Sequence, residues 1–222
     1  MLRHPFLSRR CPMPRVLVRF SKRGPLRFIS HLDTVELFKK ALRRADIPAA
    51  YSLGLTPQVR MSILHPLPVG TESEGEYLNL ETAKAFHPEE LAEKLAAKLP
   101  EGIEILMVRP VSRKLSFPRF DFHYRVEVED AEAPGEERIR ELLGRERVEI
   151  LRRKKGKERV DDVRPFLKEI ERDAEGGLRM RIASIEGRTV RPEEVLGLLC
   201  EDDPSKAPPC RVVKTETTYG DR

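Results

Sequence analysis

The sequence has no tryptophan and few aromatic residues of any kind. Phe and Tyr make up 6% of its 222 residues, and cysteine occurs only three times, at Cys11, Cys200 and Cys210. Such a chain must build its core mainly from Leu, Val, Ile and Ala. Three cysteines at these spacings fit neither a disulfide framework nor a zinc ribbon, and they are typical of a reduced cytoplasmic protein. No apolar run approaches the roughly 18 residues of a transmembrane helix, so we expect no membrane association.

Motifs of the common enzyme classes are also absent. The five histidines are scattered singly, and no Cys-x-x-Cys pair occurs. A metal centre needs several converging ligands, so we expect no metal. Neither a Gly-rich phosphate-binding loop nor a Gly-x-Ser-x-Gly nucleophile motif is present, and we expect no cofactor.

Charge is distributed unevenly along the chain. The formal net charge is +5, yet residues 1–60 hold 13 Lys and Arg residues and only three acidic residues, Asp33, Glu36 and Asp46. The first 60 residues therefore carry a net charge of +10, and the remainder carries −5. A concentration of positive charge is the footprint expected for a polyanionic partner, although a solvated surface balanced by the acidic remainder would give the same count.

Alternating and helical patterns predict an α+β fold of two ferredoxin-like units with antiparallel sheets. We expect an N-terminal extension over residues 1–14, a basic domain over 15–111, a linker at 112–118 and a second domain over 119–219. Predicted strands cover 15–21, 59–64, 76–82, 103–108, 120–128, 148–151, 178–183 and 210–215. Predicted helices cover 30–47, 87–99, 136–143 and 191–199. A basic turn at 152–157 precedes a mixed segment at 160–172.

The first predicted helix begins with a capping signal and ends before Pro48. Ser30 can cap it with Asp33, and one apolar stripe follows, made of Leu32, Val35, Phe38, Leu42 and Ala45. His31 lies in the first turn, where the helix N-terminus favours a neutral imidazole that could act as a general base on a ribose hydroxyl. The simpler interpretation is that His31 only packs against the preceding loop.

Two sets of residues are candidates for binding a substrate. The first comprises cations before and along the first helix, namely Lys22, Arg23, Arg27, Lys40, Arg43 and Arg44. The second lies on a loop punctuated by Gly and Pro and comprises Tyr51, Ser52, Gly54 and Arg60. That loop is equally compatible with a tight turn that needs Gly54 and Pro57. The acidic stretch at 72–76 is interpreted as a solvated loop.

Several of these segments resemble a bacterial family called radical-SAM-linked proteins. The resemblance is carried by Phe20-Ser21-Lys22, Arg27 to Asp33, Ala41 to Ala45 with Pro48, Tyr51-Ser52-x-Gly54, Met61-Ser62, Leu67 to Gly70, Ser73 and Glu76-Tyr77. Val160-Asp161, Arg164-Pro165 and the closing Thr215 and Tyr219 also match. One stretch departs from the family pattern: Leu55 to Arg60 stands where the family has Phe and a Pro-His-Pro-Lys-like segment, so a histidine is missing there.

Members of that family occur beside radical SAM proteins or fused to them, so the resemblance implies an accessory role. This chain lacks Cys-x-x-x-Cys-x-x-Cys and cannot hold a radical SAM cluster alone. We expect an accessory protein that binds substrate, with RNA favoured by the basic front half. The alternatives are a protein-docking module and a metal-independent RNA-acting enzyme that uses His31.

Overall fold

The computed structural model describes residues 14–114, 119–154 and 156–219. The first half contains β1 (Arg15–Lys22), η1 (Gly24–Phe28), α1 (His31–Arg44), β2 (Met61–Ile63), β3 (Glu72–Glu81), α2 (Pro88–Ala96) and β4 (Ile103–Pro110). The second half contains β5 (Arg119–Val128), α3 (Glu136–Gly144), β6 (Glu149–Lys154), β7 (Lys157–Asp162), η2 (Arg164–Phe166), β8 (Leu167–Arg172), β9 (Leu178–Ile185), α4 (Pro192–Glu201) and β10 (Cys210–Tyr219). The predicted extension lies outside the described residues except for Pro14, and the predicted linker does so over 115–118.

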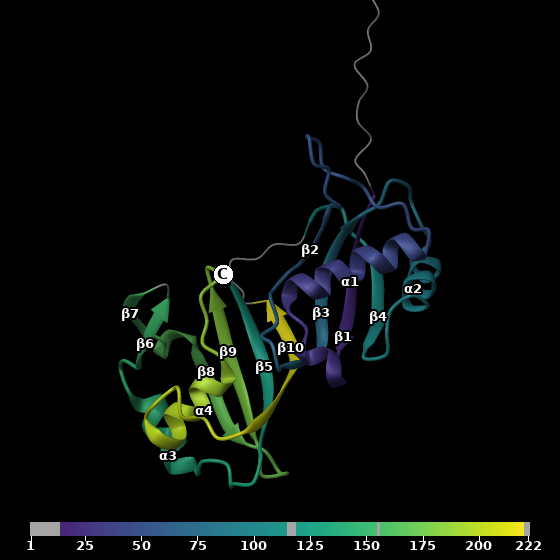
Figure 1. The fold of residues 1–222 in the computed structure, drawn as a ribbon. Coiled ribbons are helices and arrows are strands. Elements are labelled where there is room, and N and C mark those ends of the chain that lie inside the picture. Colours follow the sequence, from purple (N-terminus) through teal and green to yellow (C-terminus); the bar gives the residue numbers. More distant parts are fainter. Residues whose placement is uncertain (1–13, 115–118, 155, 220–222) are drawn as a thin grey trace, which may run out of the picture.

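The protein is α+β, as the sequence predicts. Its main sheet has eight strands in the order β4-β1-β3-β10-β5-β9-β8, and β2 pairs with β3 beside this path. The pairing is antiparallel throughout, apart from β3 with β10. Figure 1 shows the two halves side by side, with β3 and β10 where they meet. If the β6–β7 hairpin is left out, each half of the described chain has four strands with the same arrangement in the sheet. The fourth strand in sequence lies beside the first, then come the third and the second, which gives β4-β1-β3-β2 and β10-β5-β9-β8.

One continuous sheet replaces the two separate sheets that we expected. The reason is the length of β3, which begins at Glu72 rather than at Glu76. Two strands share the edge of β3 that faces away from β1. β2 pairs with residues 78–80, and β10 pairs in parallel at Glu72 and Ser73. The segment predicted as a solvated acidic loop is therefore the strand that joins the halves.

Each half has its own hydrophobic cluster, built mostly from aliphatic side chains. In the first half, Phe38, Ala41 and Leu42 of α1 pack with β1, β3 and α2. Leu32 does not belong to this face, contrary to the predicted stripe: its side chain is 73% exposed. The buried face of α1 begins instead at Thr34 and continues with Phe38, Ala41 and Leu42.

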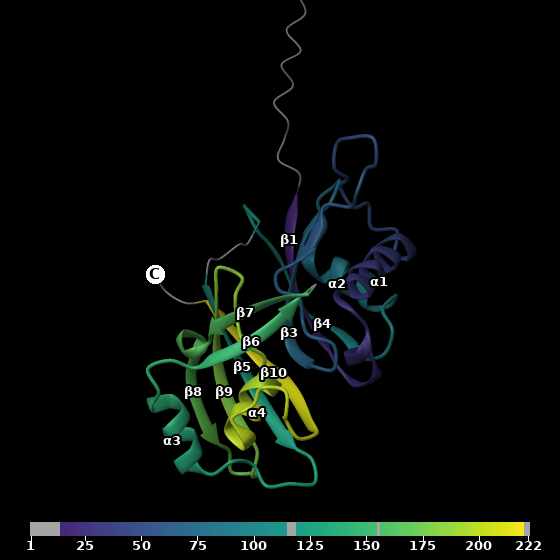
Figure 2. The same cartoon turned by 60° about the vertical axis from the view of Figure 1, so that its left-hand side comes forward.

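The second half departs from its prediction between β5 and β8. The basic stretch expected to form a turn at 152–157 instead belongs to β6 and β7, with positive φ at Gly156 between them. These strands form a two-stranded sheet apart from the main one (Figure 2). Ile150 of β6 packs into the second cluster, beneath α3 and α4.

Candidate functional site

Three charged side chains are buried where the two halves meet. Lys22 ends β1, Glu76 lies on β3 and Lys214 lies on β10; their residues are 2%, 3% and 3% exposed. Charged residues are almost never buried to this degree unless they are paired, because leaving water costs them free energy. We call this set the junction cluster.

The charge of Lys214 is balanced within the junction cluster by a carboxylate, whereas that of Lys22 is not. Glu76 Oε1 accepts a hydrogen bond from Ser73 Oγ at 2.7 Å and forms an ion pair with Lys214 Nζ across the join. Lys214 Nζ also lies 5.0 Å from the centroid of the Phe122 ring. Lys22 Nζ donates to the backbone oxygen of Ile29 at 2.9 Å, a neutral acceptor. One carboxylate thus stands against two ammonium groups, which leaves one buried positive charge in excess.

The surroundings shift the protonation equilibria of these groups. Burial lowers the pKa of Lys22, and the carboxylates of Glu76 and Asp33 only partly oppose that effect. Burial also raises the pKa of the nearby Tyr124 phenol, and the charge of Glu76 adds to the rise. A buried amine of lowered pKa is a frequent feature of functional sites, although structural ion pairs perturb pKa values too.

His65 closes the junction cluster from the loop between β2 and β3. Its ring packs edge-on against Phe120 and Phe122 of the second half, at centroid distances of 3.7 and 5.0 Å. Burial, followed by the charge of Lys214, lowers the pKa of His65 to about 4, so the ring is neutral at pH 7. Its buried Nε2 has no hydrogen-bond partner among the described residues.

A small cavity lies beside these groups and is reached by His31 from the start of α1. Lys22, His31, His65 and Glu76 line it together with Thr34, Ile63 and Leu67, and its volume is about 10 Å³. That space holds no more than one water molecule. A ribose cannot enter this cavity, so the junction cluster is an ionic contact between the two halves rather than a substrate site.

A second buried carboxylate reinforces the join next to this cluster. Glu72 Oε1 accepts from Arg27 Nη1, and its Oε2 accepts from Arg211 Nη2 on β10, both at 2.9 Å. Burial opposes ionisation of Glu72, but the two guanidinium groups outweigh it and hold its pKa below the usual range. Arg27 is therefore engaged within the fold, and Arg23 pairs with Glu74 at 3.5 Å.

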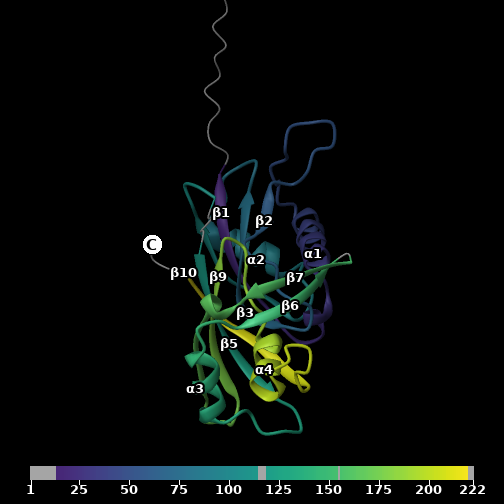
Figure 3. The same ribbon diagram turned by 90° about the vertical axis from the view of Figure 1, so that its left-hand side faces the viewer.

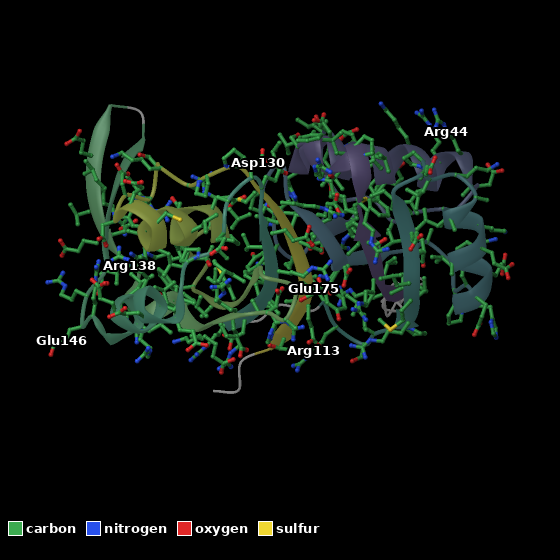
Figure 4. All side chains as sticks on the ribbon, turned by 90° about the horizontal axis from the view of Figure 1, so that it is seen from below. Arg44, Arg113, Asp130, Arg138, Glu146 and Glu175 are labelled. Carbon is green, nitrogen blue, oxygen red and sulfur yellow. The ribbon has the colours of Figure 1, made fainter. Side chains whose placement is uncertain are left out.

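The cations of α1 are placed very differently from Lys22. Lys40, Arg43 and Arg44 are exposed and make no ion pair with any described residue. Arg44 points outward at the end of the first half, well away from Arg113 (Figure 4). Lys40 and Arg44 also line a groove of about 590 Å³ together with Lys98, which follows α2. These cations form the part of the predicted set that solvent and an anionic partner can reach.

The loop candidates lie on a hairpin that projects beyond the sheet (Figure 3). Tyr51 pairs with Val59 in an isolated antiparallel bridge, and Ser52 Oγ accepts from the backbone nitrogen of Gln58 at 3.0 Å. Gly54 has a φ of +136°, a conformation that a side chain would strain. Leu53 is 82% exposed and Leu55 is fully exposed at the tip.

A cleft of about 240 Å³ lies at the base of this hairpin. Its polar lining comes from β1, the hairpin, β2, β3 and the end of the first half: Arg15, Ser52, Gln58, Arg60, Ser62, Asn79, Glu81 and Lys114. Glu81 holds both arginines through their Nε atoms, at 2.9 Å from Arg15 and 3.0 Å from Arg60. Two predicted residues, Ser52 and Arg60, are thus brought together in one cleft.

Sequence reasoning missed Glu76, Lys214 and His65 as parts of a site. The fold brings together three segments that carry motif residues, namely Lys22, His31, and Ser73 with Glu76. Lys214 is far from all of them in sequence, so spacing gave no signal that it belongs to the same site. Within the described residues, no group of three or more His, Cys, Asp or Glu side chains could hold a metal ion. None of the helices there is long and apolar enough to cross a membrane.

The fold defines an α+β protein whose two halves share one sheet and a buried ionic join. Residues 15–192 match the family model described as "Uncharacterized protein conserved in bacteria (DUF2344)", and the chain belongs to that family. No curated protein matches the chain.

Proposed function

We propose that this protein is an accessory protein of a radical SAM enzyme and binds that enzyme's RNA substrate. The observation that carries the RNA part is the exposed, unpaired group of cations on α1, Lys40, Arg43 and Arg44. Other described cations, among them Arg113, Arg140 and Arg172, also lack an ion pair with any described residue, so what distinguishes these three is that they lie together within five residues of one helix. Phosphate contacts of this kind supply the salt-dependent part of nucleic-acid affinity.

The radical SAM part rests on the resemblance of residues 15–219 to radical-SAM-linked proteins. An accessory role also agrees with the closed junction cluster, because its cavity leaves no room for a substrate beside these buried titratable groups. A chain without an open catalytic constellation would contribute binding rather than chemistry.

We further infer that the halves are two ferredoxin-like units. The repeated strand order, with helices after the first and third strands of each half, supports a shared plan. In this view the β6–β7 hairpin is an insertion in the second unit, placed before its second strand β8.

Salt dependence of RNA binding tests the function. The wild-type chain should bind structured RNA at low salt and lose about 0.7 log units of affinity per log unit of salt for each single-strand phosphate neutralised. Reversing Lys40, Arg43 and Arg44 to Glu should weaken binding and flatten the slope without unfolding the chain. Fluorescence anisotropy at several salt concentrations, with urea unfolding in parallel, measures both quantities.

A matched control uses three other exposed cations that make no ion pair with described residues. Reversal of Arg113, Arg140 and Arg172 changes the net charge by the same amount at other places on the surface. The control reversal should reduce the salt dependence of RNA binding less than the reversal of the α1 cations does. Equal losses for the two triple variants would show that only net charge matters, and a wild-type chain that binds no RNA at low salt would remove nucleic acid from the proposal.

A further inference from the structure

The cleft at the base of the 51–59 hairpin combines an anion-binding wall with an apolar floor. Arg15, Arg60 and Lys114 stand against one carboxylate, Glu81, so the lining carries an excess of two positive charges. Arg15 donates a hydrogen bond from Nε to Glu81 Oε1, Arg60 forms an ion pair with Glu81, and neither guanidinium makes another hydrogen bond or ion pair with a described residue. The terminal nitrogens of both arginines therefore remain available for an anion, and it is through these nitrogens that arginine binds phosphate.

The apolar parts of the cleft suit a flat ring. Val59 and Met61 contribute side chains to the lining. Tyr51 stands directly opposite Val59 in an antiparallel bridge, so both side chains lie on the same face of the hairpin. Tyr51 itself does not line the cleft, but it is 55% exposed and paired with Val59, so a ligand that extends past Val59 can reach it.

Hydrogen-bonding groups complete the lining. The exposed side-chain amide of Gln58 can donate and accept, and the hydroxyl of Ser62 lines the same space. Unpaired bases of RNA are recognised by this combination, namely stacking on an aromatic ring and hydrogen bonds to the base edges. The volume of about 240 Å³ is below that of pockets for drug-sized ligands and suits a single nucleotide unit.

We propose that this cleft binds one unpaired nucleotide of RNA, with its base beside Tyr51 and its phosphate on Arg60 and Arg15. This inference rests on the proposed function and adds to it the site that distinguishes single-stranded from paired RNA. The α1 cations contact phosphates of either form, whereas only a base that is free to leave its stack can enter the cleft.

Two probes test the proposal on the full chain. The first is a short labelled single-stranded RNA, compared with its own blunt duplex by fluorescence anisotropy. Tyr51→Ala should weaken single-strand binding by about fivefold to a hundredfold, because stacking on an aromatic ring is lost, and should leave the salt slope and the duplex affinity unchanged. Arg60→Gln should weaken binding and reduce the salt slope by the contribution of one phosphate contact, about 0.7 log units of affinity per log unit of salt. Phe28→Ala, which removes an exposed aromatic ring outside the cleft, is the matched control and should bind as wild type.

The second probe is a set of 5′-mononucleotides, followed by NMR chemical-shift changes. Shifts of the Tyr51 and Arg60 signals at millimolar ligand support the cleft even if long RNA does not bind, and in that case the proposed function fails alone. RNA binding that neither Tyr51→Ala nor Arg60→Gln alters overturns the inference and leaves the function standing. If neither RNA nor any mononucleotide binds, both fall.

A protein-docking loop is the remaining outcome. The exposed Leu53 and Leu55 side chains at the hairpin tip would then insert into a partner. Loss of association with a radical SAM enzyme in the Leu53→Ser/Leu55→Ser variant, together with unchanged single-strand RNA binding in Tyr51→Ala, would assign the hairpin to docking and overturn the nucleotide site.

Discussion

At the scale of single residues, the two lysines of the junction cluster are equally buried but differently compensated. Lys214 forms an ion pair with Glu76, whereas the Lys22 ammonium meets only the backbone oxygen of Ile29 at hydrogen-bond distance. An ion pair that loses one partner leaves an unpaired charge in a medium of low dielectric constant, which is strongly destabilising. Removal of the Lys22 charge, which has no carboxylate at hydrogen-bond distance among the described residues, instead relieves the cost of holding an ammonium group away from water.

Substitution of each lysine by methionine should therefore change stability in opposite directions. Lys214→Met should lower the free energy of unfolding by about 3–5 kcal/mol, because it strands Glu76. Lys22→Met should leave it unchanged or raise it by up to about 2 kcal/mol, because it removes the uncompensated cation and keeps the volume filled. Urea unfolding at pH 7 compares the two, and a larger loss for Lys22→Met would contradict the charge balance described for the cluster.

At the scale of elements, α1 connects the buried and the exposed parts of the molecule. Its first residue, His31, reaches the junction cavity, and its last turn carries Arg43 and Arg44. The predicted start of this helix is confirmed in detail: Ser30 Oγ accepts from the Asp33 backbone nitrogen at 3.1 Å, and the Asp33 carboxylate accepts from the Ser30 backbone nitrogen at 3.3 Å. The capping box fixes where the helix begins and so sets the position of His31.

Loss of this cap should cost stability without touching the cluster. Ser30→Ala should lower the free energy of unfolding by about 0.5–2 kcal/mol, since a backbone donor loses its acceptor. Ser112→Ala, at an exposed serine outside any helix, is the control and should change little. Denaturant unfolding of both variants is the measurement, and a Ser30→Ala variant as stable as Ser112→Ala would show that Asp33 alone suffices as the cap.

Local patterns predicted most helices and strands of this chain but not its join. The cap of α1, the strands β1 and β4, and the helix that begins near Pro192 follow from short-range signals of capping, alternation and proline placement. The start of β3 does not, because Glu72 to Glu76 looks like a solvated acidic stretch. Its two buried acids, Glu72 and Glu76, are neutralised by Arg27, Arg211 and Lys214, and two of these three cations come from the far end of the chain. Only the tertiary fold brings those charges together, so the site built on them could not be predicted from sequence spacing.

At the scale of the whole molecule, the two halves are held by ionic contacts and one histidine as much as by sheet pairing. His65 belongs to the first half and packs on Phe120 and Phe122 of the second. Its pKa of about 4 in the folded chain lies below the value of about 6.5 expected after unfolding. The unfolded chain therefore binds more protons between these two values, and stability rises with pH across that window.

Acidification should consequently weaken the protein before its carboxylates titrate. The contribution of a neutral His65 is fully present above about pH 6.5 and is lost as pH falls towards 4, by roughly 2 kcal/mol once solvent screening of the half-buried ring is allowed for. The wild-type free energy of unfolding should decline from pH 6.5 to 5, and His65→Gln should abolish that decline. His87→Gln, at a largely exposed histidine, is the control; an unchanged slope in His65→Gln would assign the effect to another group.

The pairing of β3 with β10 also has a consequence for the order in which the chain is completed during synthesis. Glu72 and Arg211 are separated by 139 residues, so the whole first half leaves the ribosome long before its partner strand does. Until then the edge of β3 that later pairs with β10 has no neighbouring strand at Glu72 and Ser73, and the carboxylates of Glu72 and Glu76 can remain hydrated. Contacts between distant segments form late, because the long loop between them must first close. We therefore expect the edge of β3 at Glu72 and Ser73 to stay open to water until β10 is synthesised, and the burial of Glu72 and Glu76 to be completed only when β10 pairs there.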